Sequence, residues 1–356
     1  MRIGIAGAGL LGRLLAVQLA TLGHVVDLFD PALDAAARQA AGWTAAGMLS
    51  PVAELECAEA DVFACGLRSL ELWPQIIAQL VSPVAFARRG SLLIAHRGDE
   101  GAAGRVLELL QRKAPVSYAP ERLSMEALAA VEPAVRSVVQ AWLLACEGQI
   151  HSVQAMHALA ATATSLGVVW HWGRSVLEVN PGEMVCDNGT RSFDWVFDVR
   201  GTGAQPQLPV RGVRGEIFWL HAPGVQLGRP LRLLHPRHRV YVVPRDGNIV
   251  VVGASEIESD DRSPVSLRST VELLAAAHSV LPELAEARIV HSETNLRPAL
   301  PDNNPTLVQS DGITRINGLF RHGWLLAPAL VERALTPHFS TIARQKIQYE
   351  FDHNIG

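Results

Sequence analysis

Apolar residues in the first thirty positions change their spacing twice, and these changes outline a strand, a helix and a second strand. Residues 2–6 form a short apolar run typical of a buried strand. Leucines then recur at helical spacing from Leu11 to Leu19, and Gly23 is a suitable helix stop. Residues 24–30 are again mostly apolar. This order predicts a βαβ unit whose two strands are parallel neighbours.

The rest of the chain continues to alternate between helical and strand patterns. Helical spacing predicts one helical region that ends near residue 80 and further helices over 107–113, 153–166 and 267–280, with Ser152 as the cap of the second of these. A last helix is predicted to begin near Gly323. Strand patterns cover 84–95, 168–172, 176–179, 195–199, 239–244 and 248–254. Turn residues at 187–189, 245–247 and 311–312 predict hairpins. The middle of the chain is therefore antiparallel in character.

This order predicts an α/β fold with interleaved domains. A Rossmann-like, doubly wound nucleotide-binding domain is expected from residues 1–80, 145–210 and 296–356. A mostly antiparallel β-sheet domain for the substrate is expected from residues 81–144 and 211–295, inserted between those pieces.

Composition and charge narrow the class of protein. The chain has 356 residues, of which 49% are hydrophobic and 19% charged, so a large core is expected and disorder is not. A formal net charge of −4 without a basic block gives no reason to expect a nucleic-acid partner. Four cysteines without a C-x-x-C motif favour reduced thiols and a cytoplasmic location. No apolar stretch suits a membrane span, and the spacing within 235–238 does not suit a metal, so none is expected.

A glycine fingerprint follows the first predicted strand. Gly7, Gly9 and Gly12 stand at G-x-G-x-x-G spacing before the predicted helix, and Asp30 ends the next strand. The glycines permit a tight turn, close approach of a pyrophosphate, and close helix packing, while an acidic residue in this place binds a ribose hydroxyl. These residues predict a dinucleotide site and leave NAD or FAD open. A glycine-rich turn without ligand is the alternative.

Two arginines in apolar surroundings are candidates for binding an anion. Arg297 lies within Asn-Leu-Arg-Pro-Ala-Leu, where an unpaired guanidinium would be costly. It either forms a fork for a substrate carboxylate or pairs with Glu293 or Asp302, and local sequence leaves both open. Arg321 is similar, and an anionic partner within the fold is slightly favoured for it.

Several motifs occur together in a specific order. Beyond the glycine fingerprint they cover residues 44–51, 198–204, 213–216, 241–245, 296–298 and 318–328. In this order the chain resembles the D-amino-acid oxidase class of FAD-dependent oxidoreductases, most closely the glycine oxidases of thiamine biosynthesis. The resemblance runs along nearly the whole chain.

The resemblance implies FAD, bound without a covalent link. The residues implied to bind it are Gly7, Gly9, Leu10, Leu11, Gly12, Asp30, Pro31, Ala46, Gly47, Met48, Val176, Gly201, Leu319, Phe320, His322, Gly323, Trp324 and Leu325. The chain departs from the residues common in the family at three places, namely Trp43, the Asp-Asn-Asn-Pro segment 302–305, and His322 with Trp324. Of these, Trp324 is expected to limit the size of the substrate.

The resemblance also implies a reaction. Arg297 corresponds to the arginine that holds a substrate carboxylate, and Arg321 and Tyr241 line the same pocket. The implied activity transfers a hydride from Cα of glycine, or of a similar small, N-substituted or D-amino acid, to flavin N5. The imine then hydrolyses to a 2-oxo acid, and O₂ is reduced to H₂O₂. A dehydrogenase that passes electrons to a quinone or carrier and a catalytically silent flavin-binding subunit or sensor are the alternatives, and a homo-oligomer is compatible with each.

Overall fold

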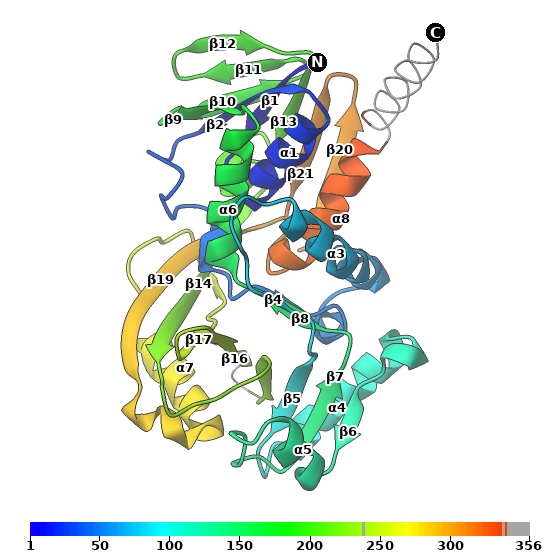
Figure 1. Cartoon of the computed structure of the whole chain (residues 1–356), viewed down its shortest axis with the longest axis vertical. Helices are drawn as coiled ribbons and strands as arrows, with labels where there is room; N and C mark the ends of the chain where they lie inside the picture. The colour runs from blue at the N-terminus through cyan, green and yellow to red at the C-terminus, as the bar shows by residue number, and fades with distance from the viewer. Residues whose placement is uncertain (237–238, 337–338, 340–356) are drawn as a thin grey trace.

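A computed structural model describes residues 1–236, 239–336 and 339 of the chain (Figure 1). Residues 237 and 238 lie outside the described residues, so the prediction that segment 235–238 binds no metal falls partly outside them. Most of 337–356, the end of the predicted nucleotide-binding domain, also lies outside them. Two large sheets organise the molecule. Within the described residues, no helix has the length and apolar character needed to cross a bilayer.

A six-stranded sheet holds the N-terminal unit. Its order is β20 (Thr306–Ser310), β21 (Ile313–Asn317), β13 (Trp195–Asp198), β1 (Arg2–Ala6), β2 (Val25–Asp30) and β9 (Val169–Trp172). All neighbours are parallel except the β20–β21 hairpin, so the predicted parallel pairing of β1 and β2 is confirmed. The predicted hairpin turn at 311–312 is confirmed as well.

Helices and a small sheet cover this six-stranded sheet. The elements packed against it are α1 (Leu10–Thr21), α8 (Gly323–Leu335) and the sheet of β10 (Val176–Asn180), β11 (Glu183–Cys186) and β12 (Gly189–Ser192). Two further helices, α3 (Ala60–Ala78) and α6 (Ser152–Ser165), pack on these helices. Helix α1 contacts both α6 and α8, and α3 contacts α8. The β10–β11–β12 sheet packs on β13 through apolar side chains that include Phe29, Met184 and Phe193.

A nine-stranded sheet forms the other half of the molecule, in the lower part of Figure 1. Its order is β18 (Ile257–Glu258), β14 (Arg211–His221), β17 (Ile249–Gly253), β16 (Arg239–Arg245), β15 (Leu231–Leu234), β5 (Ser91–Ala95), β7 (Gln140–Leu144) and β6 (Glu121–Leu123), with β19 (Arg288–Ala299) paired to β14. Among these strands, as far as the structure describes them, only the β15–β5 pair is parallel. Helix α7 (Leu267–Val280) contacts β16 and β17.

Shorter elements complete the chain. They are α2 (Ala41–Thr44), α4 (Glu100–Lys113), α5 (Met125–Val131), the sheet of β3 (Met48–Leu49), β8 (Gly148–Ile150) and β4 (Phe86–Ala87), and the 3₁₀ turns η1 (Ala53–Glu56), η2 (Val116–Tyr118), η3 (Gly201–Ala204) and η4 (Pro282–Glu286). The division into domains stays a prediction. Its boundary between residues 295 and 296 falls inside β19.

Three local predictions need correction. The strand expected over 84–95 is two strands, β4 and β5, separated by Gly90 with φ +78°. Helix α4 begins at Glu100 rather than near residue 107, because its first turns carry small residues without an apolar period. Helix α6 is capped by His151, whose side chain accepts a hydrogen bond from the Gln154 N–H at 3.4 Å. Ser152 is instead the first residue of α6.

Candidate functional site

A cavity of about 1860 Å³ is lined by residues of both large sheets. Ordinary small-molecule sites have volumes of about 300–1,000 Å³, so this cavity has room for a dinucleotide and a small substrate. Among the residues predicted for the site, Gly12 is the one that does not line the cavity. Segments far apart in the sequence therefore meet here as predicted from the motifs, although the role of each residue stays a prediction.

Gly12 acts through packing, next to the cavity. A Cβ atom at this position would lie 1.8 Å from the carbonyl oxygen of Gly7, so only glycine lets α1 approach the turn this closely. Gly7 has φ +105°, and its N–H donates to the Phe29 carbonyl at 2.8 Å. Gly9 precedes α1 without a side-chain cap, which leaves the first N–H groups of the helix free for an anion.

Asp30 stands at the end of β2, on the cavity wall. Its Oδ2 accepts a hydrogen bond from the Ala8 N–H at 2.6 Å, and its Oδ1 accepts one from the Ala32 N–H at 2.8 Å. Each carboxylate oxygen retains a further lone pair for a hydroxyl donor. The carboxylate is thus fixed beside the glycine turn and can accept a hydrogen bond from a ribose.

Arg297 extends from β19 over the backbone of β14. Its Nη1 donates to the Ser255 carbonyl at 3.0 Å and to the Arg214 carbonyl at 3.4 Å. A Cβ on Gly215 would lie 2.6 Å from the guanidinium, so this side chain needs a glycine beneath it. Burial lowers the pKa of Arg297, while the negative charge of the Glu256 carboxylate opposes that shift.

Neither local partner considered for Arg297 is bound to it. Glu293 pairs with Arg38 at 2.8 Å, and Asp302 accepts the Asn304 N–H at 3.0 Å. Residues four apart along a strand lie about 13 Å apart, which is beyond the reach of a direct ion pair between Glu293 and Arg297. Within the described ranges, Arg297 has no carboxylate at ion-pair distance.

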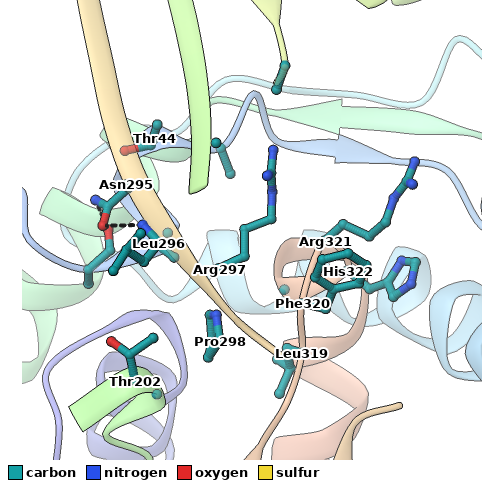
Figure 2. Close-up of a pocket in the computed structure, with 18 of the residues that line it drawn as sticks. Thr44, Thr202, Asn295, Leu296, Arg297, Pro298, Leu319, Phe320, Arg321 and His322 are labelled. Atoms are coloured by element: carbon teal, nitrogen blue, oxygen red, sulfur yellow. Dashed lines mark hydrogen bonds between the residues drawn. The ribbon is translucent and has the colours of Figure 1, made fainter. Parts of the chain in front are cut away.

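Arg321 has the partner within the fold that its sequence context favoured. Its Nε lies 3.0 Å from Glu54 Oε2, and its Nη1 lies 3.5 Å from Glu256 Oε2. Figure 2 shows the Arg297 and Arg321 side chains extending to the same side of the Leu319–His322 loop. Tyr241 of β16 also lines this part of the cavity, and burial raises the pKa of its hydroxyl.

Glu54 and Arg232 are two charged lining residues that sequence reasoning missed. Arg232 Nη2 lies 2.6 Å from Glu54 Oε1, and His322 Nδ1 lies 3.2 Å from Glu54 Oε2. Burial by itself would raise the pKa of Glu54, but the charges of Arg321 and Arg232 lower it well below its usual value. The sequence did contain a signal for Glu54, which is a charged residue among apolar neighbours. Arg297 was identified as a candidate by the same kind of pattern.

Of the places that depart from the family pattern, Trp43, His322 and Trp324 line the cavity, and residues 302–305 do not. Trp324 is 3% exposed, stacks on Trp73 with ring centroids 5.5 Å apart, and donates from Nε1 to the Gly42 carbonyl at 3.0 Å. Trp43 is also buried and lies beneath the Arg13 guanidinium. His322 belongs to the group around Glu54 described above. Across residues 1–236, 239–336 and 339, no three His, Cys, Asp or Glu side chains gather as metal ligands would.

Comparison with known proteins identifies relatives along most of the chain. The model of the family DAO, described as "FAD dependent oxidoreductase", matches residues 2–333. A protein from Rhizobium etli described as a putative thiamine biosynthesis oxidoreductase ThiO is 38% identical over 93% of this chain and 94% of its own length. Glycine oxidase from Geobacillus kaustophilus is 24% identical over 92% of this chain and 89% of its own. Its crystal structure has the same fold, with a TM-score of 0.81 over 93% of each chain and 23% identity.

Proposed function

Because this chain belongs to the DAO family of FAD-dependent oxidoreductases, we propose that it oxidises the Cα–N bond of glycine or a similarly small amino acid. The observation that carries this proposal is the half-buried Arg297 guanidinium on the cavity wall, which has no carboxylate partner among the described residues. The name of the Geobacillus relative, glycine oxidase, agrees with this choice of substrate. The name of the Rhizobium relative suggests thiamine biosynthesis as the pathway that is served.

The residues present fit FAD. The uncapped start of α1 offers N–H donors to the phosphates, and Asp30 offers an acceptor to the ribose. Helix α8 also begins at the cavity, at Gly323, without an acidic residue in its first turn, so its N-terminal dipole favours negative charge there. When bound, the flavin supplies the acceptor for the two electrons of the C–N oxidation.

The protein side chains orient and desolvate the substrate. Arg297 would hold the carboxylate through two parallel N–H···O bonds, which also fixes the direction of Cα. Tyr241, whose pKa burial raises, remains a neutral hydrogen-bond donor beside it. Overall, one amino acid, one O₂ and one water would give one 2-oxo acid, one ammonia and one H₂O₂. In this reaction O₂ is the electron acceptor, so the proposed enzyme is an oxidase.

Anaerobic mixing with small amino acids tests the activity. We expect the purified protein to be yellow, to lose flavin absorbance on adding glycine, N-methylglycine or D-alanine, and to release intact FAD on denaturation. With air admitted, one H₂O₂ should form per substrate consumed. Substrate-dependent bleaching without peroxide would indicate a dehydrogenase that uses another acceptor. Flavin that stays oxidised across the whole panel would indicate a silent flavin-binding protein.

Two predictions about context remain. Light scattering of the purified holoprotein would show whether it is a homo-oligomer. Fractionation of the source cells would show whether it is cytoplasmic, as its cysteine usage suggested.

A further inference from the structure

One carboxylate in the cavity wall is shared by three nitrogen-bearing side chains. Glu54, on the 3₁₀ turn η1, contacts Arg232 at 2.6 Å, Arg321 at 3.0 Å and His322 at 3.2 Å. We call these four residues the Glu54 cluster. Its side chains come from η1, from β15 and from the loop before α8, and none is more than 16% exposed. This ionic group is therefore almost completely removed from water.

The charges around the cluster leave one cation without an anion. The guanidinium groups of Arg232 and Arg321 share Glu54, and Arg321 also lies near the half-exposed Glu256 at 3.5 Å. Arg297 is the neighbouring guanidinium without an ion pair among the described residues. Arg239 and Glu56 line the same part of the cavity and pair with each other at 3.2 Å. Among these arginines and carboxylates, four guanidinium groups therefore face three carboxylates. This wall therefore lacks one negative charge, and one substrate carboxylate would supply it.

A second carboxylate on the same substrate would be repelled by the carboxylates that already lie beside Arg321. To reach Arg321 it would have to approach Glu54 and Glu256, or displace Glu54 from a guanidinium that Glu54 already neutralises. Like charges in a desolvated site repel strongly, and breaking a buried ion pair is costly. Arranging repulsion against a competitor is a common way to obtain specificity.

We propose that Glu54 determines specificity, because by occupying Arg321 it restricts the site to substrates with a single carboxylate. This inference rests on the proposed function, since it takes Arg297 as the site of that carboxylate. It assigns Glu54 no part in the oxidation itself. Glu54 acts through the charge that it places beside Arg321.

Binding of two matched probes to the FAD-loaded protein tests the proposal without requiring turnover. Malonate and monomethyl malonate have similar lengths and differ by one charge. Their dissociation constants follow from titration of the flavin absorbance. The wild type should bind monomethyl malonate at least tenfold more tightly than malonate. Glu54→Gln keeps the size of the side chain and removes its charge, so it should shift this ratio toward malonate by tenfold or more.

Glu59→Gln is the matched control. Glu59 pairs with the exposed end of Lys113 at 2.9 Å, is 80% exposed, and does not line the cavity, so its ratio should equal that of the wild type. A purely structural Glu54 would alter stability or FAD content and leave the ratio unchanged in molecules that retain FAD.

Several results would overturn the proposal. Equal binding of the two probes to the wild type does so by itself, even if Glu54→Gln fails to fold. An unchanged ratio in folded, FAD-loaded Glu54→Gln does so as well. If neither probe binds the wild type, the carboxylate site is wrong, and the proposed function fails together with this inference. Oxidation of small amino acids without discrimination between the probes would overturn this inference and leave the proposed function standing.

Discussion

Replacing Arg297 by alanine should lower kcat/KM for a small amino acid by roughly two to three orders of magnitude. The guanidinium is half-buried, lies over Gly215, and donates to two backbone carbonyls, which hold it in one orientation. Charge-assisted hydrogen bonds contribute roughly 1.5–3 kcal/mol each. Removing one side of a buried charge pair costs about 3–5 kcal/mol. At about 1.4 kcal/mol per tenfold change, these values give the expected loss.

The assay compares each amino acid with the amine that lacks its carboxylate. Arg297→Ala should lose most of its activity on the amino acid and little on the amine, because only the amino acid uses the guanidinium. Arg297→Lys should recover part of the loss, since an ammonium supplies charge without the planar fork. The FAD content of both variants should match the wild type, because Arg297 is assigned to the substrate.

Arg288→Ala is the matched control for this experiment. Arg288 begins the same strand, β19, and its side chain is 71% exposed, so its removal should leave kcat/KM unchanged. Equal losses by Arg297→Ala on the amino acid and on the amine would refute the reasoning, and so would full activity on the amino acid. In either case Arg297 would be a structural residue.

Three further predictions concern the cofactor, the core and pH. Gly12→Ala should lower both the Tm and the ratio of flavin to protein absorbance, because its Cβ would lie 1.8 Å from Gly7 O, whereas Gly104→Ala, with no atom near its Cβ, should not. Trp324→Ala should cost about 3–5 kcal/mol in urea unfolding, as the loss of a buried indole does; unchanged stability with a shift toward larger substrates would instead support its predicted role as a size limit. Burial, with the charge of Arg245, lowers the pKa of His151 to about 4, below the ordinary 6.5, so the unfolded chain binds the proton first and stability should fall as pH drops from 6.5 toward 4. His151→Asn keeps a capping acceptor without this titration, and its Tm should depend less on pH in that window; an identical pH dependence would contradict this explanation.

Features governed by neighbouring residues were predictable from the chain. The first strand, helix and strand follow from apolar spacing, and the hairpin at 245–247 follows from its turn residues. Gly12 was predicted to allow close packing, and the structure shows the contact that requires it. Spacing and turn chemistry act over a few residues, so one sequence contains the information they need.

Contacts between distant segments were decided only by the tertiary structure. The sequence showed that Arg297 and Arg321 each need an anion, because a buried guanidinium is costly wherever it lies. It could not show that Arg321 finds Glu54 while Arg297 finds only backbone carbonyls among the described residues. Glu54 and Arg232 are 178 residues apart, and they meet because β15 places Arg232 beside η1. Such pairings depend on strand register and on how the two sheets pack, and no local pattern along the chain encodes either of these.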